Sequence, residues 1–164
     1  MKMSVIDILI LWIHIFAAII FVGGSFFIWL VVWPVSYTLT DDEKERTRIV
    51  GKIAKRFAYF THSSLLILII TGIYNATWYL RGGISALTGT TGGRILLVKS
   101  ILVIVVIAII YSNNLYHGKL ITRLVSEGKL EKVVKIRKRT HILSFISLGL
   151  LLAITGLATA LQFY

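Results

Sequence analysis

The sequence contains no cysteine, two methionines and a single proline among its 164 residues. Without cysteine, neither disulfide bonds nor thiolate metal sites are available, and Met1 and Met3 are the only thioether ligands. Acidic residues are scarce as well, with 7 Asp and Glu against 18 Lys and Arg. The chain shows no paired carboxylates, Ser/His/Asp triad, His-Glu-x-x-His motif or phosphate-binding loop, so the sequence does not predict a hydrolase or a nucleotide-dependent enzyme.

Hydrophobic residues make up 57% of the chain and gather in four long runs, residues 8–33, 57–80, 95–116 and 142–164. An α-helix needs about 20 apolar residues to cross a bilayer. We therefore predict an all-α, integral membrane four-helix bundle that forms one domain over residues 1–164. Its helices are expected at about 5–33, 41–80, 94–126 and 130–163. The first run exceeds the apolar core of a signal peptide and is expected to stay as a helix.

Most of the basic residues lie in two connecting segments, 34–56 and 117–141. Short loops rich in Lys and Arg stay in the cytoplasm, so we predict cytoplasmic loops at 34–56 and 117–141 in a multi-pass protein of the cell membrane. Both termini then lie outside (N-out/C-out). The net charge of +11 is thereby explained by topology and attraction to the lipid bilayer, without a nucleic acid partner.

Local signals mark helix ends and a short internal repeat. Pro34 is predicted to end the first helix at Trp33, because it lacks an N–H and disfavours helix in the preceding residue. Thr40 with Glu43 resembles a capping box, so the second helix is expected to begin near Asp41. Gly128 is expected at the corner before the fourth helix. The segments 70–73 (Ile-Thr-Gly-Ile) and 154–157 (Ile-Thr-Gly-Leu) suggest two related hairpins.

Ionisable side chains inside a membrane are costly and usually face other helices. Each predicted helix carries one histidine, and Lys99 is the one charged residue well inside an apolar run. Helical spacing and depth predict an outer cluster and an inner cluster. The outer cluster comprises His14, Lys99, Arg94, Tyr74 and Asn75, with Trp78 nearby. The inner cluster comprises His62, His117 and His141.

Imidazole is a ligand for haem iron, copper and zinc, and four-helix bundles often hold cofactors between facing helices. Haem b needs one or two axial nitrogens, an apolar slot and cations near its propionates. We therefore predict His14, His62, His117 and His141 as candidate metal ligands. The candidate cofactor-binding residues are Lys99, Arg94, Tyr74, Asn75 and Trp78, with Lys99 or Arg94 near the propionates. Copper is the alternative cofactor, although the chain has few of the sulfur ligands that Cu(I) prefers.

Several motifs resemble those of a known family. His14 with Phe21-Val22-Gly23-Gly24-Ser25, then segments 71–76 (Thr-Gly-Ile-Tyr-Asn-Ala) and 93–99 (Gly-Arg-Ile-Leu-Leu-Val-Lys), resemble the copper resistance D domain family over roughly residues 8–160. HemJ-type protoporphyrinogen oxidases, which bind haem b, are more distantly similar. The resemblance implies functional roles for His14 and Lys99.

Three hypotheses of function follow. The leading one is a haem b-binding membrane protein with an electron-transfer role, whether or not it is itself an oxidoreductase, that works with a quinone or a redox partner protein. The second is a copper transport or resistance protein. The third is a structural subunit of a larger respiratory complex. A homo-oligomer is compatible with all three.

Overall fold

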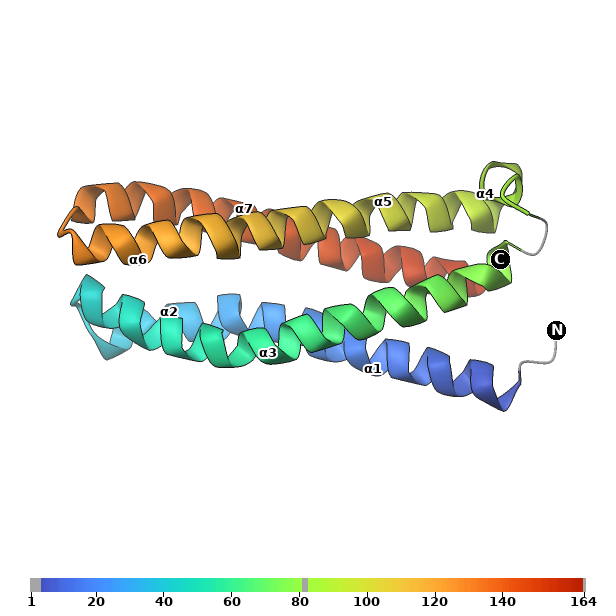
Figure 1. The fold of residues 1–164 in the computed structure, drawn as a ribbon, viewed down its shortest axis with the longest axis horizontal. Coiled ribbons are helices and arrows are strands. Elements are labelled where there is room, and N and C mark those ends of the chain that lie inside the picture. The colour runs from blue at the N-terminus through green and yellow to red at the C-terminus, as the bar shows by residue number, and fades with distance from the viewer. Residues whose placement is uncertain (1–3, 81–82, 164) are drawn as a thin grey trace. The chain divides into compact units, whose positions relative to one another are not determined.

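The computed structural model describes residues 4–80 and 83–163, apart from the side chains of residues 114, 115, 117 and 130. The described residues form helices joined by short turns, and no strand occurs among them. The chain divides into two compact units, Met1–Leu96 and Leu97–Tyr164, each built around a pair of long antiparallel segments (Figure 1).

Within the part of the chain that the structure describes, four helical spans are long and apolar enough to cross a membrane. They are Val5–Leu39, Glu43–Tyr79, Thr91–Tyr111 and Glu131–Phe163. Large apolar side chains on them are exposed, as expected where lipid covers the surface. The predicted all-α membrane fold is confirmed. Its orientation, N-out/C-out, and the reading of the chain as one domain stay predictions.

The first unit begins with α1 (Val5–Phe27), a π-helical turn η1 (Ile28–Val32) and α2 (Trp33–Leu39). After a short turn, α3 (Glu43–Ala76) runs back beside α1 and ends in the 3-10 turn η2 (Thr77–Tyr79), as Figure 1 shows. The short helix α4 (Ala86–Gly89) then leads into α5 (Thr91–Tyr111). Ser4 caps α1, because its hydroxyl accepts the N–H of Asp7 at 3.2 Å.

The predicted end of the first helix at Trp33 is wrong. The helix continues through Pro34 to Leu39, with Pro34 in the first turn of α2. The physical reason is the π turn before it, in which the N–H of Trp33 donates to the carbonyl of Ile28, five residues back. This wider turn, together with the first-turn position, tolerates a residue that has no N–H to donate.

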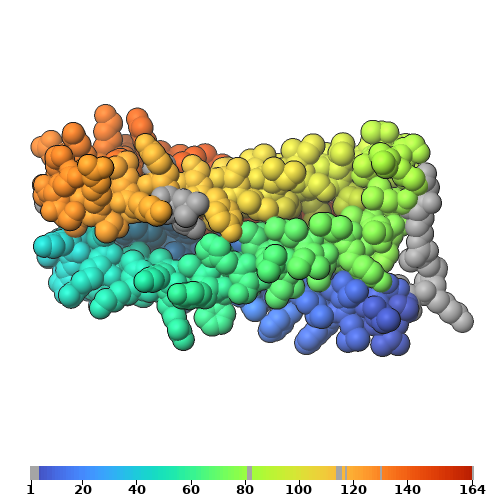
Figure 2. Space-filling model, viewed as in Figure 1, coloured from blue at the N-terminus to red at the C-terminus, as the bar shows by residue number. Residues whose placement is uncertain are grey.

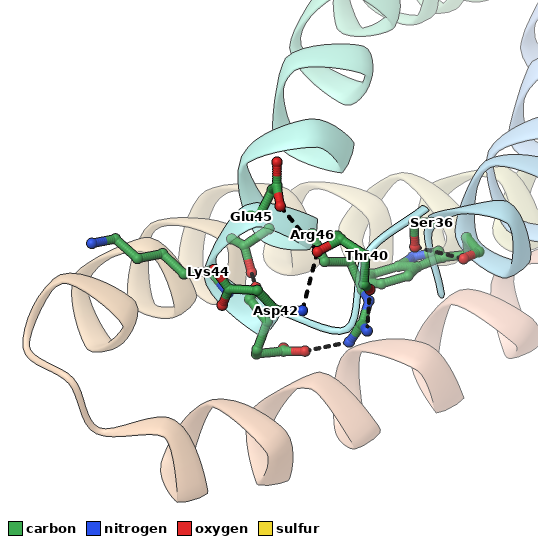
Figure 3. A network of polar contacts seen from close by, with 9 residues as sticks. Ser36, Thr40, Asp42, Lys44, Glu45 and Arg46 are labelled. Carbon is green, nitrogen blue, oxygen red and sulfur yellow. Dashed lines mark hydrogen bonds and ion pairs between the residues drawn. The ribbon is translucent and has the colours of Figure 1, made fainter. Parts of the chain in front are cut away.

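The second long helix begins at Glu43, two residues later than predicted, and its N-cap is Asp42 instead of Thr40. Asp42 Oδ1 accepts the N–H of Lys44 at 2.9 Å. Thr40 Oγ1 instead accepts the N–H of Asp42 at 3.1 Å and donates to Glu45 at 3.0 Å. Thr40 therefore shapes the turn that precedes the cap (Figure 3).

Arg46 closes the α2–α3 corner. One guanidinium nitrogen lies 2.6 Å from Glu43, the other donates to the carbonyl of Thr40 at 2.8 Å, and the group stacks 4.1 Å from the ring centre of Tyr37 (Figure 3). The residue is only 7% exposed. One planar cation thus joins the end of α2, the turn and the start of α3.

The second unit consists of the rest of α5, a π turn η3 (Ser112–His117), α6 (Gly118–Ser126), α7 (Leu130–Ala160) and the 3-10 turn η4 (Leu161–Phe163). Gly128 forms the corner before α7 with a φ of 70°, as predicted. Buried Asn113 in η3 donates to the Thr140 carbonyl at 3.2 Å and to Ser144 Oγ at 3.0 Å, which ties the π turn to α7.

The two units repeat one another element by element. The π turns start at residues 28 and 112, the Ile-Thr-Gly segments at 70 and 154, and the terminal 3-10 turns at 77 and 161. Each pair is 84 residues apart. A constant offset across three features gives structural support to the short sequence repeat.

We expect Arg46→Ala to lower the free energy of unfolding by about 1.5–3 kcal/mol, because it removes charge-assisted hydrogen bonds from a buried corner. Arg48→Ala is the matched control. Arg48 pairs with Glu45 at 3.8 Å on an exposed surface, so its loss is expected to cost less than about 1 kcal/mol. Reversible unfolding in detergent, followed by circular dichroism, measures both. Equal losses of unfolding free energy in the two variants would contradict the conclusion that Arg46 stabilises the α2–α3 corner.

Glu127 at the α6–α7 turn accepts hydrogen bonds from Lys129 Nζ at 2.6 Å and Arg123 Nε at 2.7 Å, and these bonds lower its pKa from 4.5 to about 2. The ionised Glu127 carboxylate should therefore stabilise the turn fully above pH 4.5. This stabilisation should be lost as the pH falls through about 2 and the carboxylate is protonated. Carboxyl NMR titration measures the pKa. Lys129→Gln should raise it, and a titration near 4.5 in the unaltered chain would refute the pairing.

Candidate functional site

The α1–α3 pair of the first unit brings together His14 and Thr71. His14 Nδ1 lies 2.7 Å from Thr71 Oγ1, across 57 residues of sequence. Ala17 and Phe21, on the same side of α1 as His14, are both only 3% exposed. The expectation from helical spacing that His14 points toward another helix is thus met within the first unit.

The hydrogen bonds of Thr71 indicate the tautomer of His14. The Thr71 hydroxyl donates to the carbonyl of Ile67, one turn earlier on α3, at 2.6 Å. A hydroxyl has one proton, so toward His14 its oxygen acts as acceptor and His14 Nδ1 carries the hydrogen. The basic lone pair of the imidazole is then on Nε2, the arrangement commonly found in metal-binding histidines.

Gly72 allows the ring of His14 to approach α3 closely. A Cβ at position 72 would lie 3.3 Å from His14 Cε1, tighter than ordinary van der Waals contact. A second close approach occurs further along the pair, where the Phe57 ring occupies the space that a side chain at Gly24 would fill. The two glycines therefore let aromatic and imidazole rings lie against helix backbone.

A second polar contact joins the same helices nearer the start of α1. Tyr74 donates its hydroxyl to Asp7 Oδ1 at 2.8 Å. The other carboxylate oxygen accepts the N–H and the hydroxyl of Ser4 at 2.8 and 2.9 Å. Asp7 and His14 are seven residues apart, so they share one side of α1 and lie about 10 Å apart along it.

The neighbours of Tyr74 also belong to the predicted outer cluster. Trp78 packs edge-to-face against Tyr74, with ring centres 6.2 Å apart. Asn75 is half-buried, and its Oδ1 atom is shielded from solvent without a hydrogen-bond partner in the part of the chain that the structure describes. These positions place the predicted aromatic and amide groups near one end of α3.

The cations predicted for the outer cluster both lie on α5. Arg94 is exposed in the first turn of α5, and Lys99 is half-buried further along that helix. Lys99 belongs to the second unit and His14 to the first, so the predicted convergence of these two side chains stays a prediction.

The predicted inner histidines belong to different units, so their convergence stays a prediction. His62 is exposed on α3, and its Nδ1 lies at hydrogen-bond distance from the carbonyl of Ala58 on its own helix. His141 is half-buried on α7, three residues before Ser144. The side chain of His117 is not among those that the structure describes. Among the described residues, no group of three or more His, Cys, Asp or Glu side chains gathers as a metal site.

Two partners in this site, Thr71 and Asp7, were not among the residues predicted from sequence. Thr71 stands in the Ile-Thr-Gly repeat, and Asp7 is the one acid beside an apolar run outside the loops. The seven-residue spacing of Asp7 and His14 was the signal that could have linked them to one helix face. Their partners on α3 depend on the register of two helices, which no local pattern specifies.

Comparisons with known proteins give one family match and one partial relative. The sequence profile of copper resistance protein D matches residues 51–161. The match includes Thr71, Gly72, Tyr74 and Lys99, whereas His14 precedes it. An uncharacterized protein of Aquifex aeolicus (strain VF5) is 38% identical over 76 residues, which are 46% of this chain and half of that relative's length. No solved structure matches the chain. Similarity to HemJ-type oxidases stays a prediction.

We expect His14 to be a neutral imidazole with its hydrogen on Nδ1. Nitrogen NMR of the selectively labelled chain distinguishes the two tautomers. Thr71→Val removes the accepting oxygen and should shift the ring toward a mixture of tautomers, whereas Thr71→Ser retains the hydroxyl and the original signal. A hydrogen found on Nε2 in the unaltered protein would contradict the assignment.

Proposed function

Because the chain belongs to the copper resistance protein D family, we propose that it is a membrane protein that binds and passes copper, with His14 as a copper ligand. The observation that carries the proposal is the bond between His14 Nδ1 and Thr71 Oγ1 at 2.7 Å. It orients the imidazole and assigns the metal-binding lone pair to Nε2. Copper is the substrate here, and the histidine is its contact on the protein.

The chemistry of the site suits this substrate. Imidazole nitrogen binds copper well, and a sulfur-poor chain has to rely on nitrogen and oxygen donors. Thr71 holds the ring in one orientation, as partners of metal-bound histidines commonly do. A metal binds the neutral form of the imidazole, and with the hydrogen on Nδ1 the donor atom of that form is Nε2.

Asp7 supplies negative charge at the start of the same helix face. Its carboxylate is held by Ser4 and Tyr74, so its position is defined. An anion at this place attracts a metal cation toward the face that carries His14, about 10 Å further along α1. We propose that Asp7 acts as the entry point and His14 as the next ligand.

The haem b hypothesis does not gain support from the comparisons, which favour its copper alternative. Roles for a quinone, a redox partner protein or a larger respiratory complex stay predictions, as does a homo-oligomeric state.

The test is copper binding by the purified chain in lipid nanodiscs. With Cu(II) as the probe, electron paramagnetic resonance should show nitrogen ligation, and equilibrium dialysis should give the affinity. We expect His14→Ala to abolish the nitrogen signal of this site. Thr71→Val, which leaves the imidazole in place but without its orienting partner, should weaken copper binding by roughly 10- to 100-fold.

His62→Ala is the matched control, because it also removes one imidazole from a membrane helix. His62 is exposed and bonds to its own helix, so its loss should leave copper binding unchanged. Equal effects of the two substitutions would refute the assignment to His14. A Soret absorption band in the purified protein would return the haem hypothesis to first place.

A further inference from the structure

An open hollow of about 420 Å³ lies on one face of α3, and it is separate from the His14 site. Its lining residues are Lys52, Ile53, Arg56, Phe57 and Phe60. They recur at helical spacing, so they form one continuous stripe with two cations at one end and two aromatic rings at the other. The side chains of α3 are visible along the first unit in Figure 2 (cyan to green).

The aromatic part of the hollow is held in place. The ring of Phe57 fills the space over Gly24 of α1, so it is anchored between the two helices. Phe60 is 55% exposed and Ile53 is 39% exposed, which leaves apolar surface available for contact. No side chain of the described residues lines the hollow from outside α3.

The cationic part of the hollow consists of Lys52 and Arg56. Lys52 and Arg56 are both exposed, and the ion pairs recorded for the described residues involve neither of them. Arg56 is also the last Lys or Arg on α3, because residues 57–79 contain no Asp, Glu, Lys or Arg. That stretch is about 34 Å long at 1.5 Å per residue, which matches the hydrocarbon thickness of a bilayer.

The hollow therefore lies where a lipid headgroup meets its acyl chains. Cations are needed at the headgroup level and apolar rings one turn deeper, and the stripe supplies them in that order. We propose that this hollow binds an anionic phospholipid, with Lys52 and Arg56 holding its phosphate and Phe57 and Phe60 contacting the first part of an acyl chain.

The test uses the full chain in detergent, with native mass spectrometry reporting bound phosphatidylglycerol against phosphatidylcholine. The unaltered chain should retain phosphatidylglycerol preferentially. The double variant Lys52→Gln/Arg56→Gln should lose this preference by roughly fivefold for each cation removed. The conservative variant Lys52→Arg/Arg56→Lys keeps both charges and should retain the lipid, which separates a lost site from a misfolded protein.

The charge-matched control is Lys44→Gln/Lys55→Gln, which removes two exposed cations of the same helix that do not line the hollow. This variant should keep the preference. Equal losses in both double variants would show a diffuse charge effect and overturn the proposal, as would no loss in either. Displacement of the lipid by inorganic phosphate alone would also overturn it, because a lipid site requires the acyl contact.

Discussion

Polar side chains within an apolar helix pair satisfy one another only when the two helices keep a single register, and this constraint governs the first unit. The contact between His14 and Thr71 fixes the register of α1 relative to α3 at one point. The contact between Asp7 and Tyr74 fixes the same register at a second point, about two turns away along α1. Gly72 permits the close approach that these contacts require. The orientation of the imidazole, on which the proposed copper binding rests, depends on that register.

The two units share a backbone plan and differ in the chemistry it carries. Thr155 donates to the carbonyl four residues earlier, just as Thr71 does, at 2.8 and 2.6 Å. The residue 84 positions after His14 is Val98, whose side chain has no polar group. The second unit therefore preserves the threonine and loses the imidazole. A duplicated hairpin in which only one copy has the histidine would produce this pattern.

Composition predicted most of the fold and part of the site. The hydrophobic runs indicated four spans, and helical spacing indicated that His14 faces another helix. His14 and Tyr74 were recognised as polar groups in apolar surroundings, but their partners were not, because Thr71 and Asp7 meet them only through tertiary packing. The continuation of the helix through Pro34 was missed for a similar reason, since a π turn leaves no signal in residue type.

The π turn η1 also changes which side of the helix faces inward. Residues seven apart, Asp7, His14 and Phe21, follow one side of α1, and the same count continued would arrive at Val35. Val35 is instead 45% exposed, and Ser36 is 1% exposed. One additional residue in the turn advances the phase of everything that follows it. Ser36 therefore lies in the interior where the seven-residue count would place Val35. Its hydroxyl donates to the carbonyl of Trp33 at 2.6 Å, and the helix remains unbroken.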